Sequence, residues 1–317
     1  SMVLSGPGTS SASTLQGMGS RRQPHDLGPD DLVWDFFSRP RDEPMLARVR
    51  PAAEAGFAGL GMYLGAWIAM RDDAAEVERF DQALDDNNLV VANIEVLRGW
   101  ASPDVPNEQC LAMEAVAWEI ADRFGCRYVQ AIGDFEGSIG EAARGFGALC
   151  DRAAAHGLLV GLEAVPAMTN IDTVTLAARI VAEADRPNGG LCFDSWHLTR
   201  STNDLDEIRA LPGDKVMATQ WNDGTIEPMV DDYYTDTLTT RVPPGSGEFA
   251  LIEMLRILDR NGSTAPLGLE VPSTALWQAP IGDAAASAVE GMRKVIAEAR
   301  SPRADLSSDG NPGTMDG

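Results

Sequence analysis

The sequence has few of the residues that build disulfide frameworks or metal–thiolate sites. Its 317 residues include four cysteines, and no two of them form a C-x-x-C pair. This spacing argues against a zinc–thiolate site and against a disulfide scaffold. Unpaired thiols are typical of proteins kept in a reducing compartment, so we expect a cytoplasmic protein whose four cysteines are free and buried. The cysteines are Cys110, Cys126, Cys150 and Cys192.

Basic charge and long apolar runs are also scarce. The chain has 25 lysines and arginines against 48 aspartates and glutamates, which gives a formal net charge of −23 and a sequence pI near 4.4. A field of this sign repels nucleic-acid phosphates and anionic lipid headgroups, so we expect neither nucleic acid nor a membrane surface as a partner. No run reaches the roughly 18 apolar residues that a membrane-spanning helix needs.

Two motifs that would indicate other enzyme classes are missing. The chain has no G-x-S-x-G stretch, so the neighbouring Ser195 and His197 do not indicate a serine hydrolase. It also lacks a G-x-G-x-x-G turn after its first apolar run. The nearest match is Gly59-Leu60-Gly61, where the next glycine, Gly65, comes one residue too late. A dinucleotide-binding, doubly wound sheet is therefore the less favoured α/β alternative.

Short apolar runs alternate with amphipathic stretches along most of the chain. In the stretch 107–125, Met113, Val116 and Ile120 recur at helical spacing and form one apolar face. The predicted strands are 32–37, 57–63, 89–96, 127–133, 158–166, 189–196, 215–223 and 266–273. The predicted helices lie near 44–55, 73–87, 107–125, 139–156, 171–185, 203–210, 248–260 and 282–299.

This alternation predicts a (β/α)8 TIM barrel. Repeated strand–helix units within roughly 270 residues, with strands too apolar to have a solvated face, are typical of that architecture. We expect a single catalytic domain at 31–301. The segments 1–30 and 302–317 are rich in Gly, Ser and Pro and are predicted to be disordered tails.

Oxygen-bearing side chains end four successive predicted strands: Glu163, Asp194, Gln220 and Glu270. One such residue is usually a helix N-cap or a solvated loop residue. Four at the same end of a barrel are different, because carboxylates packed together repel one another unless a cation joins them. Hard oxygen donors suit Mn²⁺ or Mg²⁺, with Co²⁺ or Zn²⁺ as further candidates. The sequence therefore predicts one divalent metal ion held by these residues.

The same stretches resemble the xylose-isomerase-like family of sugar isomerases and epimerases. The resemblance spans residues 158–275 and rests on GLEAVP, GGLCFDSWHLTR, KVMATQWNDG, TTRVPPGSGEF and PLGLEVPS. The first half of the chain matches only as strand–helix alternation, with NIEVLRGW at its third strand. The resemblance implies that Glu163, Asp194, Gln220 and Glu270 hold the metal. It also implies that the two glutamates are the acid/base pair on opposite faces of the substrate.

The resemblance also points to residues that meet the substrate. His197, in the Asp-x-x-His unit, is expected to contact the substrate or assist proton transfer, and Arg241 is expected to meet substrate oxygens or phosphate. Arg98 either binds a substrate oxygen or pairs with Glu95. Trp196 either lines a wall against the substrate or fills the core. The long segment 224–247 is predicted to be a lid or an interface element.

Two reactions fit this site. The leading hypothesis, which the resemblance implies, is a metal-dependent sugar or sugar-phosphate isomerase or epimerase. Many members of the family have histidine at the position of Gln220, whereas glutamine is shared with the 3-dehydroshikimate dehydratase branch, which makes a dehydratase the alternative. That branch usually has a Trp-Gly stretch soon after the strand-5 glutamate, where this chain has AVPAMTN.

Both reactions remove a proton next to a carbonyl, so the ligands alone do not decide between them. A non-catalytic sugar-binding barrel is a further alternative, although binding alone needs no opposed carboxylates. A multi-zinc nuclease of the related barrel type is excluded, because the chain has only three histidines. The expected partners are a small polyhydroxylated carbonyl substrate and further copies of this chain, as a homodimer or homotetramer.

Overall fold

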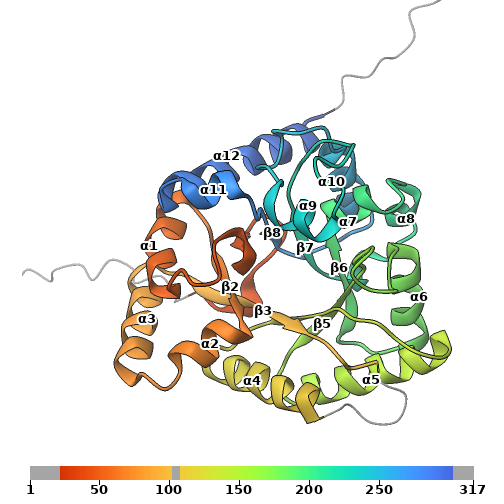
Figure 1. Cartoon of the computed structure of the whole chain (residues 1–317), viewed down its shortest axis with the longest axis horizontal. Coiled ribbons are helices and arrows are strands. Elements are labelled where there is room, and N and C mark those ends of the chain that lie inside the picture. The colour runs from red at the N-terminus through yellow and green to blue at the C-terminus, as the bar shows by residue number, and fades with distance from the viewer. Residues whose placement is uncertain (1–21, 102–107, 303–317) are drawn as a thin grey trace, which may run out of the picture.

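Eight parallel strands close into one barrel in sequence order, as Figure 1 shows. The computed structural model describes residues 22–101 and 108–302. The strands are β1 (Leu32–Trp34), β2 (Gly59–Tyr63), β3 (Val90–Leu97), β4 (Tyr128–Ala131), β5 (Leu159–Glu163), β6 (Gly189–Asp194), β7 (Val216–Trp221) and β8 (Leu267–Leu269). The predicted (β/α)8 barrel is confirmed.

The helices that were expected from the sequence form a ring around the strands (Figure 1). Their apolar faces bury residues such as Phe146 of α5 and Met292 of α12, and so they cover the outside of the sheet. The ring consists of α1 (Met45–Ala55), α3 (Ala74–Asp86), α4 (Glu108–Phe124), α5 (Ile139–Ala154), α6 (Val174–Ala184), α8 (Asp206–Arg209), α10 (Leu251–Arg260) and α12 (Ile281–Ala299). Each matches a helix expected from the sequence to within a few residues.

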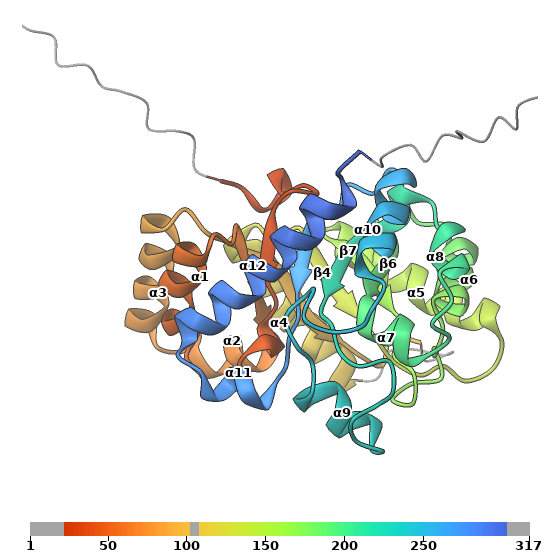
Figure 2. The ribbon, with the colours of Figure 1, turned by 90° about the horizontal axis from the view of Figure 1, so that it is seen from above.

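Other short helices, which the sequence did not predict, occur between the elements of the barrel. They are α2 (Leu64–Met70), α7 (Ser195–Arg200), α9 (Tyr233–Thr239) and α11 (Thr274–Gln278), together with the 3-10 turns η1 (Pro24–Asp26), η2 (Phe36–Ser38) and η3 (Gly213–Lys215). One or two helical turns are too short to show an apolar period in the sequence. Several of these helices follow a strand end directly, and α9 projects from one end of the barrel in Figure 2.

The domain begins earlier than residue 31. Within the predicted tail, η1 lies against the barrel, Leu27 is buried, and the Arg22 side chain donates a hydrogen bond to the carbonyl of Ala58. Asp30 forms an ion pair with Arg300 at the other end of the domain. Residues 22–30 therefore belong to the folded unit. The predicted tails at 1–21 and 303–317 lie outside the described residues.

Glycines make room for large polar side chains inside the barrel. A Cβ on Gly61 of β2 would come within 2.2 Å of the Glu95 carboxylate, and one on Gly268 of β8 would come within 2.3 Å of the Asp35 carboxylate. In the same way, Gly161 of β5 leaves room for the ring of Tyr128. The centre of the barrel therefore holds a polar layer rather than a purely apolar one.

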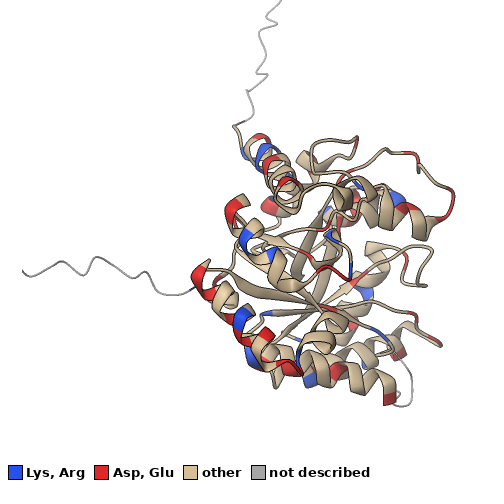
Figure 3. Cartoon of the chain, turned by 60° about the vertical axis from the view of Figure 1, so that its left-hand side comes forward, with Lys and Arg blue, Asp and Glu red and all other residues tan. Residues whose placement is uncertain are grey.

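The burial of the cysteines and the distribution of acidic residues agree with the expectations from the sequence. All four cysteines are buried, and no disulfide bond joins any two of them. Aspartate and glutamate positions, red on the ribbon, are spread over the outer helices and loops rather than gathered on one element (Figure 3). In the described part of the chain, no helix is long and apolar enough to cross a membrane.

Candidate active site

Strand register brings the predicted ligands together. Glu163 at the end of β5 is paired with Cys192 of β6, and Asp194, two residues further along β6, is paired with Gln220 of β7. Since side chains two residues apart point to the same face of a strand, all three predicted ligands turn toward the barrel interior. Glu270 directly follows β8 and so reaches the same end of the barrel.

A cavity of about 320 Å³ opens at this end of the barrel. Five residues expected to act in the site line it: Glu163, His197, Arg241, Glu270 and Arg98. Apolar walls are supplied by Phe37, Tyr63, Val96, Ile132, Val165, Met168, Leu238 and Pro272. Asp194, Gln220 and Trp196 are not among the lining residues, and each is buried.

Asp194 uses its two oxygens for different tasks. Oδ1 accepts hydrogen bonds from the backbone N–H of Trp196 (2.7 Å) and from the Asn222 amide (2.8 Å), so it caps the N-terminus of α7. Oδ2 lies 2.9 Å from Nη1 of Arg241. The structure thus confirms the helix-cap role through Oδ1, whereas the role of Asp194 as a metal ligand stays a prediction.

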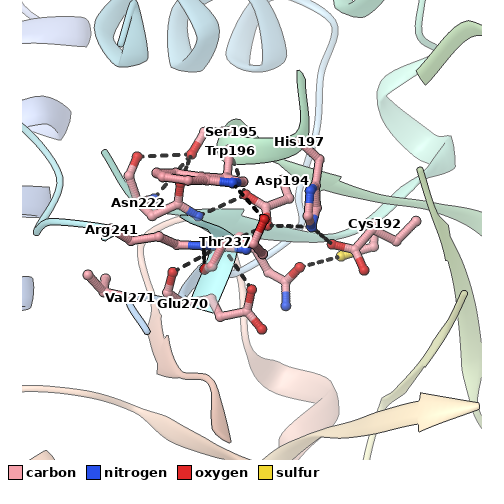
Figure 4. A network of polar contacts seen from close by, with 12 residues as sticks. Cys192, Asp194, Ser195, Trp196, His197, Asn222, Thr237, Arg241, Glu270 and Val271 are labelled. Atoms are coloured by element: carbon pink, nitrogen blue, oxygen red, sulfur yellow. Dashed lines mark hydrogen bonds and ion pairs between the residues drawn. The ribbon is translucent and has the colours of Figure 1, made fainter. Parts of the chain in front are cut away.

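Arg241 lies between two of the predicted metal ligands. Its Nη1 is 2.9 Å from Asp194 Oδ2 and 3.0 Å from Glu270 Oε2, and its side chain is almost fully buried. Figure 4 shows the guanidinium between the two carboxylates. The resemblance predicted a substrate contact for Arg241. It does line the cavity, but its closest partners are protein carboxylates.

His197 faces the carboxylates from the opposite side. Its Nε2 lies 3.5 Å from Glu163 Oε1 and 3.5 Å from Asp194 Oδ2, whereas its Nδ1 lies 2.6 Å from the hydroxyl of Tyr233 on α9. Burial lowers the pKa of His197 to about 4, against the opposing effect of the Asp194 charge. The imidazole is therefore neutral at physiological pH.

The two glutamates have perturbed proton affinities. Burial, reinforced by repulsion from Asp194 and Glu270, raises the pKa of Glu163 well above its ordinary value, although a hydrogen bond from the Gln130 amide opposes this. Burial raises the pKa of Glu270 to about 7, and the positive charge of Arg241 limits that rise. Carboxyl groups with raised pKa values in a cavity can both take and give protons near neutral pH.

Three predictions near the site have different outcomes. Gln220 lies beside Asp194, where its Oε1 accepts a weak hydrogen bond from the Cys192 thiol; its role as a metal ligand remains a prediction. Trp196 is fully buried and donates its indole N–H to Thr237, so the structure offers it no substrate contact. No ion pair joins Arg98 to Glu95 within the described residues, and Arg98 is exposed at the cavity.

The donor set fits a divalent cation. Ligand atoms of Glu163, Asp194 and His197 lie within 4.8 Å of one another, and all three residues are buried. In the described ranges, Arg241 is the one arginine or lysine that forms an ion pair with Asp194 or Glu270, so the buried carboxylates outnumber their fixed cations. A bound cation would offset the excess of negative charge.

Sequence reasoning missed a second acidic layer below the cavity. Asp35 and Glu95 are almost fully buried, and Asn93 donates to Asp35 Oδ1 at 2.8 Å. Burial, with repulsion from neighbouring acids, raises the pKa of Asp35 well above its ordinary value and that of Glu95 to about 8. Asp35, Glu95 and Gln130 are polar residues in or just after predicted apolar strands, which is the signal that found the ligands on later strands.

The predicted lid carries the short helix α9. Its base is held by the Asp223 carboxylate, which accepts backbone hydrogen bonds from Gly224 (2.9 Å), Gly245 (2.9 Å) and Phe249 (3.0 Å). Tyr234, Thr237 and Leu238 of α9 line the cavity. The segment is therefore ordered over the site, anchored at both of its ends.

A profile of the xylose isomerase-like TIM barrel family matches residues 49–296. The chain belongs to this family. The resemblance seen in the second half of the sequence thus extends over most of the barrel.

Two curated relatives of this xylose isomerase-like barrel are named 3-dehydroshikimate dehydratase. The protein from Pseudomonas aeruginosa is 34% identical over 148 residues, which cover 47% of this chain and 23% of the relative. The protein from Pseudomonas putida is 29% identical over 164 residues, which cover 52% of this chain and 25% of the relative. The matched segments thus span about a quarter of the length of these relatives.

Solved structures share the fold at lower identity. A xylose isomerase-like TIM barrel/4-hydroxyphenylpyruvate dioxygenase fusion protein has a TM-score of 0.74 at 21% identity, covering 86% of this chain and 43% of that one. The IOLI protein, solved with a zinc atom, has a TM-score of 0.73 at 17% identity, covering 86% and 100%. A D-allulose 3-epimerase from Methylomonas sp. has a TM-score of 0.62 at 17% identity, covering 84% and 97%. At these identities the likeness concerns the fold.

Proposed function

We propose that this chain is a divalent-metal-dependent lyase that dehydrates a cyclic hydroxy ketone bearing a carboxylate, of the 3-dehydroshikimate kind. The observation that carries the proposal is that proton-transfer groups and unpaired cations share one cavity. Glu163, Glu270 and His197 line its inner part, and Arg41 and Arg98 line it as well. The names of the two curated relatives, and the glutamine at position 220, support the same reaction class.

The two arginines are unusual in so acidic a protein. Arg41 and Arg98 are both exposed, and among residues 22–101 and 108–302 neither has a carboxylate within ion-pair distance. The guanidinium of Arg41 lies 5.0 Å from the ring centre of Phe37 and 5.7 Å from that of Tyr63, which places it beside the apolar wall. Planar guanidinium groups bind carboxylates well, so a substrate with a carboxylate fits this cavity better than a neutral sugar does.

The chemistry needs one group that takes a proton and one that gives a proton. A bound divalent cation would act as a Lewis acid on the substrate ketone and so make the adjacent C–H more acidic. Glu163 or Glu270 in its ionised form removes that proton. The C–O bond to the β-hydroxyl then breaks, and the other glutamate, in its protonated form, supplies the proton that lets the hydroxyl leave as water, while neutral His197 can donate a hydrogen bond to it. The apolar walls limit the access of bulk water.

The decisive experiment measures turnover of 3-dehydroshikimate by the purified chain loaded with Mn²⁺ or Mg²⁺. We expect an ultraviolet-absorbing aromatic acid to form, and chelation to abolish its formation. A panel of ketoses and ketose phosphates is assayed in parallel. Conversion of a ketose without any aromatic product would contradict the dehydratase proposal, and absence of all turnover at saturating metal would favour a non-catalytic barrel.

The second candidate is the metal-dependent isomerase or epimerase that the sequence first suggested. The observation in its favour is that Glu163, from β5, and Glu270, from the end of β8, both line the cavity and both have raised pKa values. Two such carboxyl groups could remove a proton from one side of a substrate and return it on another. The same ketose panel tests this candidate directly.

A further inference from the structure

Two side chains of the lid helix α9 contact residues of α7. Thr237 Oγ1 accepts a hydrogen bond from the Trp196 indole Nε1 at 3.1 Å. The Tyr233 hydroxyl lies 2.6 Å from Nδ1 of His197. Nε2 of His197 faces Glu163 and Asp194. Trp196, His197 and Thr237 are labelled in Figure 4.

The tautomer of His197 decides the direction of its hydrogen bond with Tyr233. The hydroxyl can donate to Nδ1 or accept from it. A neutral imidazole that accepts at Nδ1 carries its proton on Nε2.

The surroundings of Nε2 favour the tautomer with the proton on Nε2. Nε2 lies 3.5 Å from an oxygen of each of two carboxyl groups, and the nearby Asp194 oxygen is also ion-paired with Arg241. An N–H directed at these oxygens is attracted to them, whereas a nitrogen lone pair would be repelled by the Asp194 carboxylate. The aromatic rings of His197 and Tyr233 are nearly parallel, with centroids 6.1 Å apart and an interplanar angle of 26°, so the lid also fixes the orientation of the imidazole.

We propose that Tyr233 is a positioning residue that holds His197 in the Nε2–H tautomer, so that His197 is a hydrogen-bond donor to the substrate and not a metal ligand through Nε2. A protonated Nε2 has no lone pair to give a cation, which assigns the metal to the carboxylates and Gln220. An N–H at this place can hydrogen-bond a leaving hydroxyl or a developing oxyanion. Only this last consequence rests on the proposed function.

Nuclear magnetic resonance can read the tautomer directly, because the chain has only three histidines. The full-length protein is labelled with ¹⁵N-histidine, and its two-bond ¹H–¹⁵N correlations are recorded at neutral pH without metal and with saturating Mg²⁺ or Zn²⁺. His197→Gln assigns the His197 signals by their loss. We expect Nδ1 to be unprotonated and Nε2 to be protonated in both states. A proton on Nδ1, or Zn²⁺ ligation of Nε2, would overturn the proposal.

Variants then test the part played by the lid. Tyr233→Phe keeps the ring but removes the hydroxyl, and Tyr234→Phe is the matched control because Tyr234 lies next in α9 and also lines the cavity. We expect Tyr233→Phe to give a mixture of tautomers and to lower kcat about tenfold with little change in KM, the size of one lost hydrogen bond. Tyr234→Phe should leave the tautomer unchanged. An unaltered tautomer in Tyr233→Phe would refute the assignment to Tyr233.

The spectra and the assays fail independently. If the wild-type chain shows the Nε2–H tautomer but turns over no hydroxy ketone, the proposed function fails and the inference on Tyr233 stands. If turnover is observed while Nδ1 carries the proton, the inference on Tyr233 fails and the proposed function stands. The wild-type spectrum decides the tautomer even if a variant fails to fold.

Discussion

The two oxygens of Asp194 have different partners, and this division explains how one residue serves both the fold and the site. Oδ1 accepts from Trp196 N and from the Asn222 amide, and so it starts α7 at the point where β6 ends. That geometry directs Oδ2 at Arg241 and brings His197, one helical turn later, over the same carboxylate. The cap therefore positions the Asp-x-x-His unit, because α7 fixes the spacing of its two members.

Glu163 and Glu270 give the sharpest test at the scale of single residues. Glu163→Gln and Glu270→Gln keep size and hydrogen bonding but remove the proton-transfer group. We expect each to lower kcat by about 10²- to 10⁴-fold, while the circular dichroism spectrum stays that of the wild type. Glu227→Gln, in the exposed part of the segment after β7, is the control and should keep full activity. Full activity in both cavity variants would rule out carboxylate proton transfer.

The buried Glu95 predicts how the stability of the folded protein depends on pH. Burial, with repulsion from Glu270, raises its pKa to about 8, whereas a glutamate in an unfolded chain has a pKa of about 4.3. The folded protein therefore binds a proton that the unfolded chain releases between these values. The stabilisation from this group is complete below pH 4.3 and is lost as the pH rises through 8.

Denaturant unfolding of the metal-free protein between pH 5 and 8 measures this effect. We expect the free energy of unfolding of the wild type to fall by on the order of 3 kcal/mol across this range, and that of Glu95→Gln to fall by clearly less. Glu290→Gln, on the exposed face of α12, should follow the wild type. Parallel curves for the wild type and Glu95→Gln would show that Glu95 is ionised in the fold.

At the scale of elements, the sequence predicted the helices that have an apolar period and the strands that recur in regular alternation with them. The apolar stripe of α4 and the runs that became β5 to β8 were readable, because spacing and strand ends determine them. The α7 and α9 helices were not readable, since one or two turns show no period. The polar side chains Asp35, Glu95 and Gln130 were overlooked, although a polar residue in an apolar strand run was a visible signal.

Side-chain direction beyond a strand end could not be read from sequence. Trp196 follows Asp194 by two residues, but the first turn of α7 directs its ring into the core, against Phe249 and Arg200. Arg241 reaches Asp194 across 47 residues of chain, and only the folded segment after β7 shows that its partners are carboxylates. Local pattern gives the kind of residue at a site, whereas contacts between distant segments decide what it touches.

The segment 224–247 provides a prediction at this scale. Asp223→Ala removes the carboxylate that binds three backbone N–H groups at the base of the segment. Leaving such groups unpaired costs about 1–3 kcal/mol each, so the segment should open more often. We expect proteolysis within 224–247 to accelerate at least about tenfold, and KM to rise. Limited proteolysis with mass spectrometry would measure the first effect.

The control for this experiment lies in the same segment. Asp231→Ala removes one negative charge from an exposed position of the loop and leaves the Asp223 contacts in place. Its cleavage rate should equal that of the wild type. Equal rates in all three proteins would mean that Asp223 does not anchor the segment, and that the strand-like pairing of residues 223 and 242 is sufficient to do so.

For the whole molecule, charge and metal binding act together. A net charge of −23 attracts divalent cations to the entire surface, so stabilisation by metal is not by itself proof of a site. The candidate site differs from the surface because its carboxylates are buried, and the part of their mutual repulsion that Arg241 leaves would be relieved by a cation that enters the barrel. A variant that changes the buried donors and leaves the surface intact separates the two effects.

Thermal unfolding of the chelated protein, with and without Mn²⁺, tests this separation. At a concentration about 100 times the dissociation constant, a metal that binds only the folded state stabilises it by about 2.7 kcal/mol, which corresponds to a rise in Tm of roughly 5–10 °C for a domain of this size. We expect this rise in the wild type and in Glu227→Gln, because the latter has one surface carboxylate fewer and an intact site. In Glu163→Gln the rise should fall to at most about a third of the wild-type value, since one buried donor is lost. Equal rises in all three proteins would place the bound cations on the surface and remove the metal from the proposed mechanism.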